Sequence, residues 1–246
     1  PYGTPLDGTV ESVSALTRDD LIAAHRGALA RDRLYVSAVG DITADELGAL
    51  LDRLLADLPE VRDDLPRPAD PRFDGGIEVV DFDTPQSVVR FAQPGLDFDH
   101  PDYFAAFILN HILGGGGFES RLMTEVREKR GLTYGVYSFL VDKDQADLWM
   151  GSVASANDRV AETIEVIRAE WTRARDEGVS AEELDQAKTY LTGSYPLRFD
   201  GNGPIARIMV AMQMSGMPID YIATRNERVN AVTRDDVNRV ARALVD

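Results

Sequence analysis

The sequence predicts a mixed α+β fold in which a few short strands alternate with amphipathic helices. Residues 133–141 and 146–154 are rich in β-branched and aromatic side chains and flank a polar turn at 142–145, which is typical of an antiparallel hairpin. Apolar residues at helical spacing before and after the hairpin predict helices. Of the 246 residues, 44% are hydrophobic, and this proportion argues against disorder.

The first 60 residues predict a helix, a strand and a second helix. Thr17 is the expected N-cap of the first helix, and Thr43, followed three residues later by a glutamate, opens a capping box for the second. Between them, residues 34–39 are largely apolar and predict a buried strand. Residues 61–76 are rich in proline, aspartate and glycine, so we expect a linker there.

The region after this linker predicts two strands and then helices on either side of the hairpin. The strands are expected at 77–82 and 87–91. A strongly apolar helix at 102–113 runs into four consecutive glycines, and a short amphipathic helix follows at about 120–130, where Gly131 stops it. Later helices are predicted at 160–177, 181–191, 204–215, 218–228 and 233–244.

One short pattern occurs twice. Residues 15–21 (ALTRDDL) are nearly repeated at 231–237 (AVTRDDV). The simplest explanation is a duplicated unit of about 200 residues, of which this chain holds the tail of one copy and most of the next. A copy without its last strand would expose a sheet edge, so we expect pairing there with residues 34–39 or self-association with another copy of the chain.

The charge balance excludes one class of partner. The chain has 26 lysines and arginines against 42 aspartates and glutamates, a formal net charge of −16. It is therefore a poor nucleic-acid binder, because affinity for phosphates depends on basic side chains. The acidic surface either aids solubility or lines a cavity that attracts cationic peptides.

Two absences narrow the class of protein further. No stretch approaches the ~20 uninterrupted apolar residues that a membrane span needs, so no membrane segment is expected. The chain has no cysteine, which excludes disulfides, thiolate metal ligands and a cysteine nucleophile. The lack of disulfides does not fix the compartment, and both periplasm and cytoplasm stay open.

The three histidines carry no zinc motif. Neither HExxH nor HxxEH occurs, and no G-x-S-x-G marks a nucleophile, so we expect no metal and no nucleophilic centre in this chain. His25 is predicted to be a surface or packing residue of a helix. His100 is predicted to be a turn residue, and His111 a hydrogen-bonded histidine of the core.

The run Gly114, Gly115, Gly116 and Gly117 is the most unusual local feature. One interpretation is a mobile backbone whose N–H groups bind an anion or a peptide carbonyl. The other is a plain connection between two helices.

Arg127 and Tyr134 are separated by seven positions and a glycine turn. An arginine at a helix end and a tyrosine at a strand start can converge on one point there, where a guanidinium and a phenol suit a peptide carbonyl or a developing oxyanion. The alternative is that Arg127 pairs with a nearby glutamate and Tyr134 packs half-buried.

Periodicity gives two finer expectations for this segment. Phe118, Leu122 and Val126 are predicted to share the buried face of the short helix. Tyr134 is predicted to share a strand face with Val136, because side chains alternate along a strand.

The sequence from 109 to 136 carries a long ordered pattern. It contains LNHILGGGGFESRL at 109–122 and EVREKRGLTYGV at 125–136. This pattern resembles the pitrilysin/insulinase family of zinc metallopeptidases, and shorter matches extend the likeness over essentially the whole chain. The resemblance implies duplicated insulinase-like domains, each a mostly antiparallel sheet flanked by helices, whose two halves close around a substrate chamber.

The resemblance also implies roles for residues. One half of such an enzyme carries the zinc motif, whereas the other half offers a glycine-rich loop and an Arg/Tyr pair that hold the substrate. By this likeness Arg127, Tyr134 and the glycines 114–117 bind substrate, and no catalytic residue or metal ligand is assigned to this chain. The zinc cofactor is expected in the catalytic partner half. Glu119 departs from the family pattern, in which a small residue is common.

The same likeness implies a domain division. Residues 1–60 correspond to the C-terminal tail of a preceding homologous domain and residues 61–76 to the linker. Residues 77–246 correspond to a non-catalytic insulinase-like domain that is truncated before its last strand.

The implied function is that of the substrate-binding, non-catalytic half of a zinc-dependent endopeptidase, which is not active alone. Its partner is a homologous zinc-bearing half, either upstream in the same polypeptide or in a separate subunit, and its ligand is a peptide. One alternative is a catalytically empty subunit that retains the fold and serves assembly. Another is an anion-binding module that uses the glycines.

Overall fold

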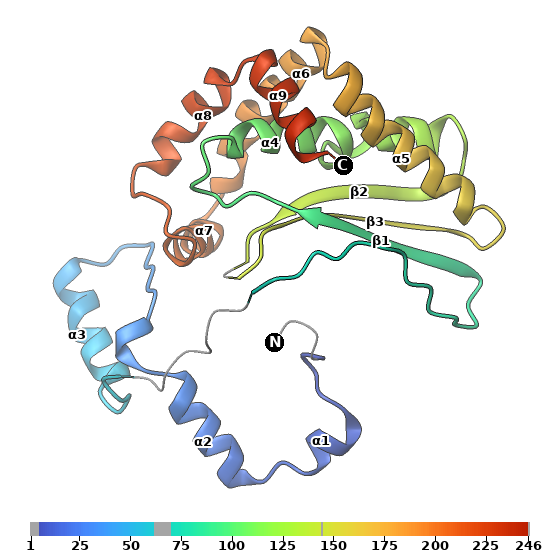
Figure 1. Cartoon of the computed structure of the whole chain (residues 1–246). Helices are drawn as coiled ribbons and strands as arrows, with labels where there is room; N and C mark the ends of the chain where they lie inside the picture. Colours follow the sequence, from blue (N-terminus) through green and yellow to red (C-terminus); the bar gives the residue numbers. More distant parts are fainter. Residues whose placement is uncertain (1–4, 62–69, 144, 246) are drawn as a thin grey trace. The chain divides into compact units, whose positions relative to one another are not determined.

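The computed structural model of the chain describes residues 5–61, 70–143 and 145–245. Half of the predicted linker (residues 62–69) and one position of the predicted hairpin turn lie outside these ranges. The described residues fold into two compact units (Figure 1). Unit 1 takes its residues from 1–67 and 199–217, and unit 2 from 68–198 and 218–246.

Unit 1 is helical. Its α-helices are α1 (Val10–Ser14), α2 (Arg18–Ala28), α3 (Ala44–Leu55) and α7 (Asn202–Met214). Thr17 and Thr43 form the predicted capping boxes at the starts of α2 and α3. In each box the threonine hydroxyl accepts a hydrogen bond from a backbone N–H three residues later, and the carboxylate at that position accepts one from the threonine N–H.

The strand predicted at 34–39 does not form. A strand needs a neighbour for its backbone hydrogen bonds, and the described residues of unit 1 supply no second strand. The carbonyl oxygen of Val36 instead accepts a hydrogen bond from the side-chain amide of Gln213 in α7, at 3.1 Å. The segment therefore connects a 3₁₀ turn, η1 (Arg31–Arg33), to α3.

Unit 2 is built on a three-stranded antiparallel sheet in the order β1-β3-β2. The predicted hairpin is confirmed as β2 (Thr133–Val141) and β3 (Leu148–Ala156). The third strand, β1 (Gln86–Pro94), covers the predicted strand at 87–91 and pairs with the other edge of β3. The two long contacts of the sheet thus both involve β3, its central strand.

The strand predicted at 77–82 is not part of the sheet. Its apolar side chains are solvent-exposed, and Val79, for example, is 85% exposed. A strand here would have to pair with an outer edge of the sheet, at β1 or β2, and the described residues place no further strand at either edge. Within the described part of the chain, residues 77–82 therefore have no neighbouring strand with which to form backbone hydrogen bonds.

The helices of unit 2 lie on one face of its sheet (Figure 1). They are α4 (Tyr103–Asn110), α5 (Val160–Glu177), α6 (Ala181–Gly193), α8 (Tyr221–Ala231) and α9 (Arg234–Leu244). Trp149 and Val153 of β3 are buried in one core with Ile108 of α4 and Val240 of α9. Each such side chain contributes about 1.5–3 kcal/mol when it leaves water. The predicted α+β class, an antiparallel sheet flanked by helices, is confirmed.

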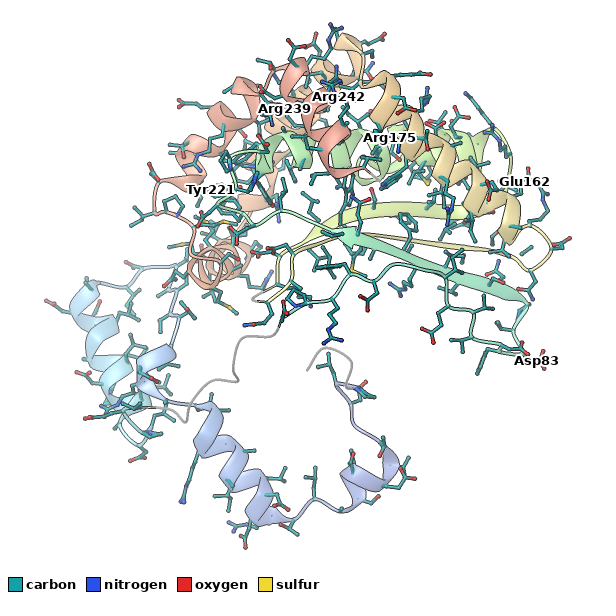
Figure 2. All side chains as sticks on the ribbon, viewed as in Figure 1. Asp83, Glu162, Arg175, Tyr221, Arg239 and Arg242 are labelled. Carbon is teal, nitrogen blue, oxygen red and sulfur yellow. The ribbon has the colours of Figure 1, made fainter. Side chains whose placement is uncertain are left out.

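An ion pair joins two helices of unit 2. Arg239 of α9 donates hydrogen bonds of 2.6 and 2.7 Å to the carboxylate of Asp102 at the start of α4; Figure 2 labels the arginine. These bonds lower the pKa of Asp102.

None of the described helices is long and apolar enough to cross a membrane.

Candidate functional site

The predicted site segment lies between α4 and β2 of unit 2. The sequence predicts that the helix ends before the glycines. Instead, α4 continues into the first two glycines as a wider π-helical turn, η2 (His111–Gly115). A 3₁₀ turn, η3 (Gly117–Glu119), follows, and a π-helical stretch, η4 (Met123–Glu128), completes the predicted short helix. Gly131 then adopts the predicted left-handed conformation, with φ of +59°.

The four glycines do not form one open loop. A Cβ added to any of the first three would lie 2.5 to 2.7 Å from another heavy atom. At Gly114, which is buried, the nearest atom is Ser138 Oγ of β2, at 2.5 Å. Gly117 differs, because it has open space around it and a φ of +62°. The first three glycines therefore permit close packing, whereas Gly117 turns the chain.

Asn110 holds this segment against the sheet. Its buried side-chain oxygen accepts hydrogen bonds from Ser138 Oγ of β2 and from Trp149 Nε1 of β3, both at 2.8 Å. A Cβ on Gly115 would lie 2.7 Å from the amide nitrogen of Asn110, so the asparagine and the glycine fit each other. The end of α4 and the turn after it are therefore fixed on β2.

Tyr134 lies in a β-bulge at the start of β2. Thr133 is opposite Ser155 and Val136 is opposite Val153, so β2 has one residue more than β3 between these pairs. The bulge breaks the alternation of side chains. Val136 is buried, whereas Tyr134 is 89% exposed, so the predicted shared strand face is wrong. The bulge presents the tyrosine to solvent instead of to the core.

Arg127 of η4 lies beside Tyr134, as the spacing predicts. Its guanidinium carbon is 5.6 Å from the centre of the Tyr134 ring and 4.7 Å from the centre of the Phe118 ring. Among the described residues, Arg127 forms no ion pair or side-chain hydrogen bond. Its N–H groups are therefore available to a ligand, and the alternative arrangement, with Arg127 paired to a glutamate and Tyr134 half-buried, does not occur in the described chain.

Phe118 is misplaced by the periodicity. It is predicted on the buried face with Leu122 and Val126, which are both buried, but it is 60% exposed. Phe118 belongs to η3, and the next helix begins only after Ser120, whose hydroxyl accepts a hydrogen bond from the Met123 N–H at 3.4 Å. The helix predicted at about 120–130 already leaves Phe118 outside, and Ser120, a preferred N-cap, marks its start.

The carboxylate of Glu125, on the same helix, is already compensated. Lys129 Nζ and Arg130 Nη1 each donate a hydrogen bond of 2.7 Å to it. These bonds lower the pKa of Glu125. Lys129 and Arg130, which are close to Arg127 in the sequence, therefore both pair with Glu125 and neutralise its charge.

A partly buried ion pair fixes the start of this helix. Arg121 Nε and Nη2 donate hydrogen bonds of 2.6 and 2.9 Å to the Glu183 carboxylate of α6, and Nη2 also donates to the Gly178 carbonyl at 2.9 Å. Burial opposes the ionisation of Glu183, but the hydrogen bonds from Arg121 and from the Ser180 backbone outweigh it and lower the pKa of Glu183 to about 2. The partners are 62 positions apart, so no local pattern marks them.

None of the three histidines is among the described residues that contact the Arg127 guanidinium. His25 is exposed on α2, and His100 is the predicted turn residue, whose Nδ1 accepts a hydrogen bond from the Asp102 N–H at 3.1 Å. His111 is half-buried and stacks on the Tyr190 ring, with ring centres 5.1 Å apart, and burial lowers its pKa. No three described His, Asp or Glu residues form a group that could hold a metal ion.

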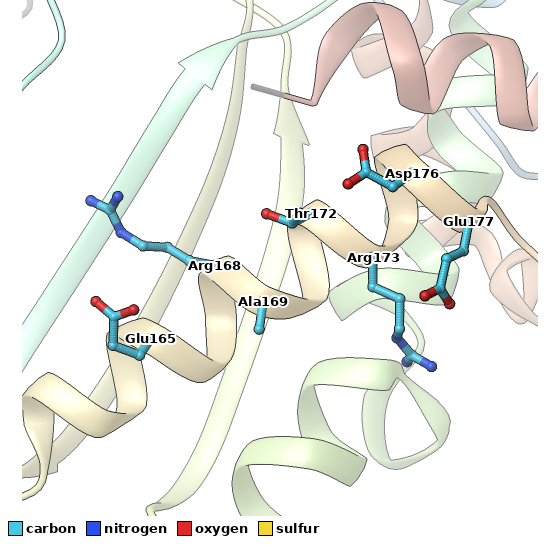
Figure 3. Close-up of a pocket in the computed structure, with 7 residues that line it drawn as sticks. All are labelled: Glu165, Arg168, Ala169, Thr172, Arg173, Asp176 and Glu177. Carbon is cyan, nitrogen blue, oxygen red and sulfur yellow. The ribbon is translucent and has the colours of Figure 1, made fainter.

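A shallow hollow on α5 contains none of the predicted site residues (Figure 3). One helix supplies its whole lining, which is mostly charged. The lining residues are Glu165, Arg168, Ala169, Thr172, Arg173, Asp176 and Glu177. A surface made by a single helix offers no enclosed space for a ligand, so the segment around Arg127 stays the candidate site.

Comparison with known proteins gives a family match over most of the chain. The family model described as "Peptidase M16 inactive domain" matches residues 15–191. This range contains the glycines, η4 and the start of β2, and thus the whole arrangement around Arg127.

Individual relatives agree with this match. An uncharacterized zinc protease of Streptomyces coelicolor is 29% identical over 99% of this chain and 54% of its own length. A probable mitochondrial-processing peptidase subunit beta of Schizosaccharomyces pombe is 28% identical over 100% of this chain and 56% of its own. A crystal structure of a peptidase M16 inactive domain from Pseudomonas fluorescens is 30% identical, with a TM-score of 0.83, over 100% of this chain and 58% of that one. The chain therefore spans little more than half of these relatives.

Proposed function

Because the chain belongs to the family of the peptidase M16 inactive domain, we propose that it is the substrate-binding, non-catalytic half of a zinc-dependent endopeptidase. The family resemblance predicted from residues 109–136 is confirmed by the match. The proposed partner is a homologous zinc-bearing half, and the proposed ligand is a peptide. Relatives about twice as long as this chain, and one named as a subunit, support either a joined or a separate partner.

The observation that carries the proposal is the placement of Arg127 beside Tyr134. The guanidinium carbon is 5.6 Å from the phenol ring, and the N–H groups of Arg127 have no side-chain acceptor within the described chain. A guanidinium has only donors to offer, and the phenol O–H adds one more. Two donors that face the same region suit a peptide carbonyl oxygen, especially one that gains negative charge during cleavage.

The glycine segment supports the same role in part. The first glycine is buried against β2, but Gly115, Gly116 and Gly117 are at least partly exposed. In the proposal, the exposed backbone of these three glycines lies close to an extended peptide, and Gly117, where a Cβ would meet nothing within 4 Å, leaves room for it. Gly114 serves packing alone, whereas Gly115 and Gly116 also pack against Asn110 and His111.

The described residues contain no group of three or more His, Asp or Glu side chains that could hold a metal ion. The proposal therefore gives this chain no step that uses zinc, and it leaves the metal to the partner half. This chain binds and orients the peptide.

The test is turnover by the chain assembled with its zinc-bearing half. In R127A we expect kcat/KM for a peptide to fall by about 100-fold, because a charged donor to the carbonyl is lost. Y134F, which removes only the phenol O–H, should lower it by about 10-fold. R127K keeps the charge but not the planar arrangement of donors, so its kcat/KM should be intermediate between those of wild type and R127A. Unchanged kcat/KM in both R127A and Y134F would refute the proposal.

A second candidate, an assembly subunit without a role in substrate binding, is favoured by exposed apolar surface. Leu50 and Leu54 lie one helical turn apart on α3 and are 44% and 71% exposed. An R127A/Y134F double variant separates the candidates. Full turnover that still requires the presence of this chain would support the assembly role.

A further inference from the structure

Phe118 is an exposed aromatic side chain with no core to pack into. It follows Gly117, whose left-handed backbone turns the chain, and it is 60% exposed. The side chains of the neighbouring helix that do enter the core, Leu122 and Val126, are fully buried. The position of Phe118 therefore does not come from burial in the protein.

The ring of Phe118 contacts Arg127 of the proposed substrate-binding pair. Its centre is 4.7 Å from the guanidinium carbon of Arg127, closer than the Tyr134 ring at 5.6 Å. Aromatic faces attract a guanidinium through their quadrupole. Since no side chain of the described residues forms an ion pair with Arg127, the two rings are the groups that hold the guanidinium in place.

Such a contact occupies little of an aromatic ring. The guanidinium covers part of the Phe118 ring, and the remaining apolar surface faces solvent next to the donors of Arg127. A peptide whose carbonyl oxygen accepts a hydrogen bond from Arg127 carries side chains within a few ångströms of that oxygen. An apolar side chain there would remove both itself and the free part of the ring from water.

We infer that Phe118 is a specificity-determining residue, which selects peptides with an aliphatic or aromatic side chain next to the carbonyl that Arg127 binds. The inference rests on the proposed function. Peptides with glycine or an acidic residue at that position leave the ring exposed and are disfavoured. The same ring also orients the guanidinium, so loss of the side chain has two separable effects.

The test compares peptides that differ at one position near the cleaved bond, with leucine, glycine or aspartate, in the chain assembled with its zinc-bearing half. We expect wild type to prefer leucine over glycine by about tenfold in kcat/KM at one position. F118A should reduce this ratio to below about threefold. F118L, which keeps an apolar surface but loses the aromatic face, should keep the preference while lowering kcat/KM for all peptides. F82A removes another exposed phenylalanine of unit 2 and should change neither quantity.

The outcomes separate this inference from the proposed function. If R127A lowers turnover but F118A lowers kcat/KM by one factor for all peptides, Phe118 only positions Arg127 and the specificity role is wrong. An F118A variant with wild-type turnover and preference refutes the inference entirely. If kcat/KM is unchanged in both R127A and Y134F, the proposed function fails. Thermal unfolding of each variant verifies that it is folded, and F118L provides the comparison if F118A is not.

Discussion

Gly114 is the one of the four glycines whose backbone lies directly against the sheet. A Cβ there would lie 2.5 Å from Ser138 Oγ and 2.7 Å from the Ser138 backbone nitrogen. The backbone atom cannot rotate away as a side chain could. The contact between η2 and β2 therefore depends on the absence of one methyl group.

We expect G114A to lower the free energy of unfolding by about 2 kcal/mol, because overpacking forces the backbone of η2 or β2 to shift. Chemical denaturation measures the change. The control is G193A, at the last residue of α6, where a Cβ would meet nothing within 4 Å. That substitution should leave stability unchanged or raise it by up to about 1 kcal/mol. Equal losses in the two variants would contradict the packing argument.

Single residues also show where sequence reasoning succeeds and fails. The juxtaposition of Arg127 and Tyr134 is predictable, because a short helix end, one glycine turn and a strand start leave the two side chains few ways to separate. The side of β2 on which Tyr134 lies is not, since the bulge depends on pairing with a distant strand. The exposure of Phe118 also depends on a backbone turn at Gly117 that spacing does not specify.

Secondary-structure elements are also predicted correctly where their signals are local and wrongly where they depend on distant partners. The helices that follow the capping boxes at Thr17, Thr43 and Ser180 begin as predicted because their caps are local, whereas the short α1 after the box at Thr9 is not predicted. The strands predicted at 34–39 and 77–82 are absent because an apolar run forms a strand only beside another one. The hairpin is predicted correctly because its two strands are neighbours in the sequence and supply each other's backbone hydrogen-bond partners.

The ion pair of Arg121 with Glu183 ties η4 and the glycine segment to α6. We expect E183Q to destabilise the protein by about 2 kcal/mol at neutral pH, because it leaves a guanidinium that is 8% exposed without its counter-charge. The estimate is below the value for a fully buried pair, since the Glu183 side chain is 29% exposed. Urea denaturation measures the loss.

The pH dependence of this pair has a definite sign. The pKa of Glu183 falls from an ordinary 4.5 to about 2 on folding, so its contribution is complete above about pH 4.5. The contribution is lost as the pH falls from about 4.5 toward 2. The difference in unfolding free energy between wild type and E183Q should therefore shrink over this range. A difference that stays constant would show that the charge of Glu183 is not the stabilising feature.

At the scale of the whole molecule, unit 1 leaves apolar surface uncovered. The leucines of α3 follow the predicted helical spacing, yet none of the residues of that helix is buried. Burial of an apolar stripe is the usual source of stability for such a helix. In the proposed assembly with a homologous half, the stripe has a partner to pack against.

We expect L50D and L54D on α3 to weaken association with the zinc-bearing half by at least about tenfold each, because a carboxylate would enter an apolar contact. Binding titration and size-exclusion chromatography measure the change. A49D adds the same carboxylate on the opposite side of the helix, where the residue is exposed, and should bind normally. Loss of stability in the isolated chain with unchanged association would show that the stripe packs within the chain instead.

Tyr134, in the β-bulge of β2, contributes little to the folded core, although the proposal assigns it to ligand binding. If Tyr134 were deleted, Thr133 and Val136 would still meet Ser155 and Val153, now with equal numbers of residues between them on the two strands. The sheet would lose nothing from its interior, because that tyrosine contributes almost no buried surface. The core therefore does not depend on the Tyr134 side chain, which leaves that side chain available for the ligand contact proposed above.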